Sequence, residues 1–279
     1  MTARARSPHA ALAAGVALLL SGVLAVSPIA GQAARATDTP AVWNGGVTLY
    51  REGVFATQRT WLWCTAAGVQ IVRNIVEGDD DHSRAAQERY FDWMRTRNRY
   101  DLPESAGVDP AGWTAGLRRF VDDRYRLVAS RSYDDAVWSA ARNLRLTNLP
   151  VALTVANGGH GWIMTGFEAT ADPLATDDFQ VTSVRVVGPL YGRQSRNGYD
   201  MPPDTRLTVA QLRRYVTPWR YAPMPMVWDG RYVSIQPVVT DVAVDAPVPV
   251  VRDREGRARP SAPTSRRFMT SAIAGPSIR

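Results

Sequence analysis

The chain has 279 residues, enough for one large domain or two small ones, and 45% of them are hydrophobic, which excludes global disorder. Its formal net charge of +7 is concentrated at the two ends. Residues 1–36 hold three arginines and no acidic residue, and residues 241–279 hold seven arginines against four acidic residues. Residues 37–240 therefore carry only about +1, so the net charge gives no support for nucleic-acid binding by this part of the chain.

Residues 1–36 have the three parts of a secretory signal peptide. Two arginines supply the positive end, residues 10–26 are uncharged and apolar apart from one serine, and residues 34–36 fit the A-x-A cleavage rule. An uncleaved membrane anchor is the alternative, although the apolar run is short for a membrane span. We expect a secreted mature protein that begins near Thr37 and has no stable membrane insertion.

The stretch around Cys64, the single cysteine, predicts a reactive thiol. Trp61, Cys64 and Gly68 fall at spacings of three and four, which indicates one face of a buried helix. Free N–H groups and peptide dipoles at a helix N-terminus favour an anion, so a thiol there is held partly as thiolate. Gln58 carries an amide that can donate to an oxyanion beside the sulfur. The alternative is a small core residue, the commoner role of a lone cysteine.

Three more helices are predicted from their start signals. One covers residues 83–97 and begins after Ser83 or a preceding aspartate. Asp109 followed by Pro110 marks the start of the next, and Ser132 opens another with a capping-box pattern. The acidic run before the first of these helices lacks the alternating ligands of a Ca²⁺ loop, so no metal is expected there.

The apolar pattern becomes that of strands near Pro150, so we expect an antiparallel sheet after the helices, an α+β fold. Residues 37–240 are expected to form one domain. Residues 241–279, rich in Pro, Arg, Ser and Ala, are expected to be a flexible tail. Strands are predicted at residues 47–50, 125–129, 151–155, 160–170, 180–187 and 232–237, and a last short helix at residues 208–215.

His160 begins one of these strands, between Gly159 and Gly161, so little side-chain bulk blocks its ring. A thiol early on a helix and a histidine on a later strand is the arrangement that thiol catalysis needs. The imidazole takes the thiol proton, and the resulting ion pair holds a reactive thiolate. A strand histidine alone is more often structural, but Gln58 and Cys64 together favour the catalytic interpretation of His160.

These residues resemble the papain-like cysteine peptidases, and within them the bacterial C39-like branch. Gln58 stands six residues before Cys64, as the oxyanion-hole glutamine does in that superfamily. The tryptophan before Cys64 and the small residues after it are similar to the start of the family's catalytic helix. The order helix, Leu-Pro-Val, strand, His160 and Thr-Gly-Phe resembles the family's approach to its histidine. The resemblance covers residues 58–189.

The resemblance implies a fold in which N-terminal helices, with the catalytic cysteine at a helix start, pack on an antiparallel sheet that carries the histidine. It implies a secreted hydrolase of peptide or amide bonds that forms an acyl-enzyme on Cys64, with His160 as base and Gln58 in the oxyanion hole. The expected partner is a peptide or protein substrate. We expect a monomer with no cofactor and no metal.

The sequence departs from the family at Gly188, where the family has an Asp or Asn that orients the imidazole. The Gly188 carbonyl, Asp177, Asp178 and Asp200 are the alternatives for that role. A missing orienting side chain favours a second hypothesis, a catalytically weakened or inactive papain-like scaffold that acts as a secreted binding protein. A transglutaminase-like acyl transferase is a third hypothesis. The candidates for the walls of a cleft are Trp61, Trp63 and Trp162.

Overall fold

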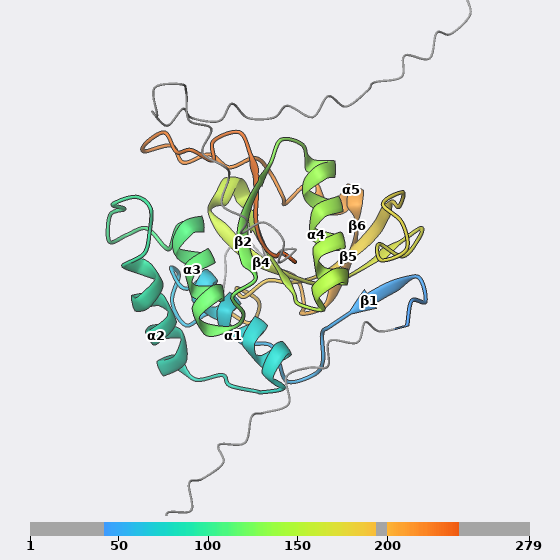
Figure 1. Cartoon of the computed structure of the whole chain (residues 1–279). Helices are drawn as coiled ribbons and strands as arrows, with labels where there is room; N and C mark the ends of the chain where they lie inside the picture. The colour runs from blue at the N-terminus through green and yellow to red at the C-terminus, as the bar shows by residue number, and fades with distance from the viewer. Residues whose placement is uncertain (1–41, 194–199, 240–279) are drawn as a thin grey trace, which may run out of the picture.

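The fold is described from a computed structural model that defines residues 42–193 and 200–239. The predicted signal peptide, residues 1–36, and the predicted tail, residues 241–279, lie outside the described residues. Helices surround an antiparallel sheet, so the predicted α+β class is confirmed (Figure 1). In chain order the elements are β1 (Gly46–Thr48), α1 (Cys64–Glu77), α2 (Arg84–Arg95), α3 (Pro110–Phe120), β2 (Tyr125–Ser130), α4 (Tyr133–Thr147), β3 (Val151–Val155), β4 (His160–Ala169), β5 (Val181–Val187), β6 (Thr205–Thr208), α5 (Val209–Leu212) and β7 (Tyr232–Pro237).

The sheet has the strand order β2, β7, β3, β4, β5, β6, and every neighbouring pair is antiparallel. β3 pairs with the first half of β4, and β1 pairs with its second half. The last strand, β7, lies between β2 and β3, which precede it by many residues. β6 was not expected from the sequence. No helix among the described residues has the length and apolar character needed to cross a membrane.

Both faces of the central strands are covered by helices. Ala152 and Ile163 pack in the core formed with α1, α2 and α3, whereas Leu153 and Trp162 pack in the core formed with α4. Neighbouring residues of a strand point to opposite faces, so a strand covered on both sides is buried along its length and mostly apolar. β3 is buried throughout and β4 is buried except at Glu168, so the hairpin that carries His160 is firmly packed.

The predicted helix starts are confirmed for α2, α3 and α4. Ser83, Asp109 and Ser132 each accept a hydrogen bond from the backbone N–H three residues later, at 3.2, 2.9 and 3.0 Å. The prediction that Trp61 lies on the same helix face as Cys64 is wrong. α1 begins at Cys64, and Trp61 lies before it with 58% of its surface exposed.

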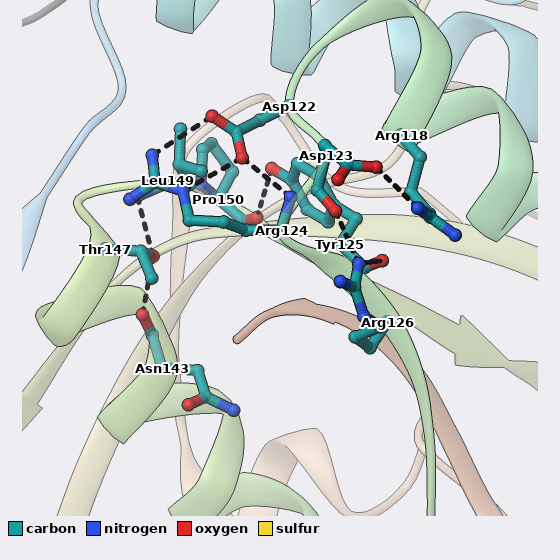
Figure 2. A network of polar contacts seen from close by, with 10 residues as sticks. All are labelled: Arg118, Asp122, Asp123, Arg124, Tyr125, Arg126, Asn143, Thr147, Leu149 and Pro150. Atoms are coloured by element: carbon teal, nitrogen blue, oxygen red, sulfur yellow. Dashed lines mark hydrogen bonds and ion pairs between the residues drawn. The ribbon is translucent and has the colours of Figure 1, made fainter. Parts of the chain in front are cut away.

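A polar corner fixes the start of the β3 and β4 hairpin to the edge strand β2 (Figure 2). The Tyr125 hydroxyl donates to the Pro150 carbonyl oxygen at 2.8 Å. The Thr147 hydroxyl donates to the Asn143 carbonyl oxygen at 2.6 Å and accepts from the Leu149 N–H at 3.3 Å. These bonds satisfy backbone groups at the end of α4, where the helical pairing stops. They hold the entry of β3 against the rest of the sheet.

Candidate active site

Cys64 is the first residue of α1. The preceding residue, Trp63, provides no side-chain hydrogen bond to cap the helix, so the N–H groups of the first turn have no side-chain partner there. Cys64 is half-buried, whereas every residue from 65 to 72 is buried. The thiol therefore lies at an anchored helix end that favours negative charge, and it is open to a reagent or substrate.

His160 follows a turn in which three successive residues have positive φ. The angles are 53° at Ala156, 56° at Asn157 and 88° at Gly158. The left-handed region is unfavourable for residues other than glycine, and such strained residues cluster at functional sites. The turn joins Val155 to His160, which are paired across the β3 and β4 hairpin.

The segment 215–220 holds this turn in its strained form. The Ala156 N–H donates to the Tyr215 carbonyl oxygen at 3.0 Å, and the Asn157 N–H donates to the Thr217 hydroxyl at 2.8 Å. The N–H of Arg220 donates to the Asn157 carbonyl oxygen at 3.0 Å. A segment distant in sequence therefore fixes the residues that come directly before the histidine.

The structure brings the side chains of Cys64 and His160 together in a hydrogen bond. The Nε2 atom of His160 lies 2.9 Å from Oδ2 of Asp200. An imidazole has two nitrogens, so Nδ1 is the one that faces the thiol. A carboxylate can only accept, which places a proton on Nε2 and leaves Nδ1 to exchange a proton with Cys64. Thiol, imidazole and carboxylate thus form a catalytic-triad arrangement.

The carboxylate of Asp200 is held by two further donors. Its Oδ1 accepts from the Trp162 indole N–H at 2.6 Å, and its Oδ2 accepts from the Leu190 backbone N–H at 2.5 Å. Its side chain is only 1% exposed. His160 and Trp162 are two residues apart on β4, so the strand directs both side chains to the same carboxylate. A buried carboxylate with several donors is held in one orientation.

Among the alternatives for orienting His160, Asp200 is the residue at the imidazole. Oδ1 of Asp177 instead lies 3.0 Å from Nε of Arg142, and Asp178 is exposed. The Gly188 carbonyl accepts from the Tyr191 N–H at 3.2 Å. Gly188 therefore does not leave the imidazole without an orienting group, which removes the sequence argument for an inactive scaffold. The sequence offered no signal for choosing Asp200, which lies beyond a loop and outside any motif.

Burial lowers the pKa of the His160 imidazole, but the hydrogen bonds and charges of Asp200 and Cys64 outweigh burial and raise this pKa from 6.5 to about 9. A carboxylate behind the ring and a sulfur in front of it both stabilise the imidazolium. The histidine is therefore protonated at neutral pH, which is the state required for an imidazolium–thiolate pair.

Gln58 is buried next to the loop after β5, with 1% of its surface exposed. Its backbone N–H donates to the Pro189 carbonyl oxygen at 2.8 Å, and its Nε2 donates to the Thr60 carbonyl oxygen at 2.8 Å. Its Oε1 is buried and has no partner among the described residues. An amide nitrogen carries two hydrogens, so one donor remains beyond the bond to Thr60. Gln58 does not line the cavity described below, although Cys64 and His160 do.

Gln87 of α2 forms hydrogen bonds with the backbone on both sides of Gln58. Its Oε1 accepts from the Arg59 N–H at 2.9 Å, and its Nε2 donates to the Thr57 carbonyl oxygen at 3.0 Å. The same nitrogen donates to Oε1 of Gln70 at 2.7 Å. Gln87 is fully buried, so these bonds are shielded from water. They fix the backbone on both sides of Gln58.

Cys64 and His160 open into a cavity of about 500 Å³. Its walls include Trp113 of α3 and Trp219 of the segment before β7, both at least nine-tenths buried. Neither tryptophan was among the sequence candidates for a cleft wall. Of those candidates, Trp63 and Trp162 are buried in the cores and Trp61 is exposed, and none of them lines this cavity.

Two glycines next to His160 make room for these tryptophans. A Cβ on Gly158 would lie 2.3 Å from the Trp219 ring, and a Cβ on Gly161 would lie 2.7 Å from the Trp113 ring. Gly161 therefore allows the aromatic wall to approach the strand, rather than leaving the imidazole uncovered as the sequence suggested. Within residues 42–193 and 200–239, no group of three or more His, Cys, Asp or Glu side chains is arranged to hold a metal ion.

The sequence matches no protein-family profile and no curated protein. Among solved structures, the chain is similar to a crystal structure of UfSP from C. elegans, with a TM-score of 0.34 and 13% sequence identity. This similarity covers 63% of the chain, and the chain spans 30% of the UfSP chain. A similarity this weak carries no argument about activity, so the chemistry is inferred from Cys64, His160 and Asp200.

Proposed function

We propose that this protein is a papain-like cysteine peptidase that hydrolyses peptide or amide bonds through an acyl-enzyme on Cys64. The observation that carries the proposal is the hydrogen bond between Cys64 and His160, with Asp200 bonded to the far nitrogen of the ring. Nucleophile, base and orienting group are joined in that order by hydrogen bonds, which is the arrangement of an activated nucleophile.

In the first step the Cys64 thiolate attacks the substrate carbonyl carbon, a C–S bond forms, and the carbonyl electrons move onto oxygen. The resulting oxyanion is stabilised by the Cys64 backbone N–H and the remaining Gln58 amide donor. The C–N bond then breaks, and the imidazolium of His160 donates its Nδ1 proton to the leaving amine. Asp200 keeps Nε2 protonated throughout.

In the second step a water attacks the thioester carbonyl carbon. His160, now neutral, takes the water proton on Nδ1, a C–O bond forms, and the C–S bond breaks. The carboxylic acid product leaves, and the imidazolium–thiolate pair is restored. Hydrolysis consumes one water and needs no cofactor.

The fold supports the papain-like assignment. α1 begins at the cysteine and packs against β4, the antiparallel strand that begins at the histidine. Gln58 precedes the cysteine by six residues, and its loop is tied to the loop after β5 through Pro189. These elements stand in the order expected from the resemblance noted in the sequence.

The experiment is alkylation of Cys64 by iodoacetamide, followed by intact mass, together with cleavage of a mixed peptide library. Wild-type Cys64 is expected to react faster at neutral pH than Cys64 of the His160→Ala variant, because the imidazolium stabilises the thiolate. Cys64→Ser and His160→Ala should abolish cleavage and leave the circular dichroism spectrum unchanged. Equal alkylation rates, or cleavage that survives Cys64→Ser, would contradict the proposal. Transfer of the acyl group to an added amine would indicate a transferase instead.

We further propose that the protein acts outside the cytoplasm after removal of residues 1–36, with a peptide or protein as substrate. The positive end, the apolar run and the A-x-A site support this location. Intact mass of protein recovered from the culture medium is expected to correspond to a chain that begins at Thr37. Full-length protein retained in the membrane fraction would contradict it.

A further inference from the structure

The cavity beside Cys64 and His160 contains an arginine that the chemistry above does not use. Arg220 lines this cavity and has an exposed side chain. Its side chain forms no hydrogen bond or ion pair with the described residues. Most arginines near the surface of this fold are engaged; for example, Nη2 of Arg213 lies 2.6 Å from Oδ1 of Asp134. An unpaired guanidinium in the wall of a catalytic cavity is available to bind an anionic group of a substrate.

Arg220 is held in place by its backbone. Its N–H is bonded to the turn before His160 through Asn157, and its neighbour Trp219 packs on Gly158 of the same turn. The Trp219 N–H donates to the Arg231 carbonyl oxygen at 2.7 Å, which closes the loop behind it. The root of the Arg220 side chain therefore lies in a fixed position relative to His160.

The other charged side chain in the wall of this cavity, besides the His160 imidazole, is already satisfied. Asp109 is 1% exposed, and its carboxylate accepts N–H bonds from Gly112 at 2.9 Å, Arg99 at 2.6 Å and Tyr100 at 3.1 Å. It serves as the N-cap of α3, and its oxygens already accept these three hydrogen bonds, so it is not a partner for Arg220. His160 is paired with Asp200 and Cys64. Arg220 is thus the charge in this cavity that remains for a substrate.

We propose that Arg220 binds a carboxylate of the substrate, so that the enzyme prefers an acidic group close to the bond that it cleaves. The proposal rests on the proposed peptidase function and names its substrate class. The carboxylate is either an Asp or Glu side chain beside the scissile bond or the free C-terminus of a short peptide. A guanidinium binds a carboxylate through two parallel N–H bonds, a geometry that a lysine ammonium does not offer.

The first test needs no turnover. Cys64 is alkylated with iodoacetate, an anion, and with iodoacetamide, its neutral counterpart, and the ratio of the two rates is measured. Arg220→Gln is expected to lower the rate with iodoacetate, relative to the rate with iodoacetamide, by about threefold. The effect should be smaller at high salt, because an exposed charge is screened. The matched control is Arg214→Gln, which removes the same charge from an exposed arginine that does not line the cavity.

The second test distinguishes the two sources of the carboxylate. Peptide pairs that differ by Glu against Gln next to the cleaved bond, or by a free against an amidated C-terminus, are compared by kcat/KM. The pair that Arg220 recognises should show a preference of about fivefold in wild type and Arg214→Gln, and none in Arg220→Gln. Arg220→Lys should retain part of it, since the charge remains and the two-pronged geometry is lost.

The two failures are distinguishable. An iodoacetate ratio that is equal in wild type and Arg220→Gln overturns the role of Arg220, even if Cys64 cleaves peptides. A ratio that falls only in Arg220→Gln supports the carboxylate site, even if no peptide in the library is cleaved. A Cys64 thiol that neither reagent alkylates overturns both proposals.

Discussion

The carboxylate of Asp200 occupies the space that a side chain at position 188 would fill. A Cβ on Gly188 would lie 2.4 Å from Cγ of Asp200 and 2.7 Å from each of its carboxylate oxygens. The φ angle of Gly188 is not positive, so the glycine is required here by the close approach of Asp200 and not by backbone conformation. The lack of a side chain at position 188 therefore makes room for the carboxylate that orients His160.

Gly188→Ala is therefore expected to displace Asp200. The unfolding free energy should fall by about 1–3 kcal/mol, as for overpacking of a well-packed core, and kcat should fall with it because His160 loses its fixed orientation. Denaturant unfolding and kcat on the best peptide of the library measure both effects.

A double-mutant cycle supplies the control for this prediction. Asp200→Gly alone should lower kcat, but Gly188→Ala added to Asp200→Gly should have little further effect, since the clashing carboxylate is gone. If Gly188→Ala costs as much in the Asp200→Gly background as in wild type, the steric relation between these residues is wrong.

The stability of the fold is expected to depend on the protonation of His160. Its pKa in the folded protein is about 9 against an ordinary value of 6.5, so the folded state binds the proton more tightly than the unfolded state. The resulting stabilisation, about 3 kcal/mol, is fully present below pH 6.5 and is lost as pH rises through about 9.

Denaturant unfolding across that pH window, in wild type and Asp200→Asn, measures this dependence. Asp200→Asn removes the carboxylate charge and should flatten the loss of stability between pH 6.5 and about 9. The alkaline limb of the kcat/KM profile should also lie near pH 9 in wild type and at lower pH in Asp200→Asn. Identical pH profiles in the two proteins would show that Asp200 does not set the pKa of His160.

Gln58→Ala is expected to lower kcat on the order of 10²-fold with little change in KM, because it removes a donor that acts on the transition state. The rate of Cys64 alkylation should stay near the wild-type value, since that reaction forms no oxyanion. A loss of alkylation together with a loss of stability would indicate that Gln58 only holds its loop to Thr60 and Pro189.

Gly158→Ala is expected to destabilise the fold more than Gly78→Ala. Both glycines have positive φ, 88° and 78°, so each alanine pays a similar backbone cost of about 1 kcal/mol. A Cβ at position 78 meets nothing within 4 Å, whereas one at position 158 meets the Trp219 ring, which adds about 1–3 kcal/mol. Equal losses in unfolding free energy would mean that Trp219 does not press on the turn before His160.

The local signals in the sequence were sufficient for most of the elements. Ser83, Asp109 and Ser132 identify helix starts because a capping side chain bonds to a backbone group only three residues away. The change of period near Pro150 identifies the β3 and β4 hairpin for the same reason, since periodicity is a property of neighbouring residues. β6 has Leu207 as its one buried residue, so it shows no apolar period, and it was missed.

The sequence by itself determined that a thiol begins a buried helix and that a histidine begins a strand, because both follow from residues close in the chain. The tertiary structure alone decided which carboxylate stands behind His160 and which side chains surround the thiol. Asp200 is forty residues from His160, and Trp219 and Arg220 lie further still. Their contacts depend on how the loop after β5 and the segment before β7 fold back over the sheet, and no spacing or period encodes such a return.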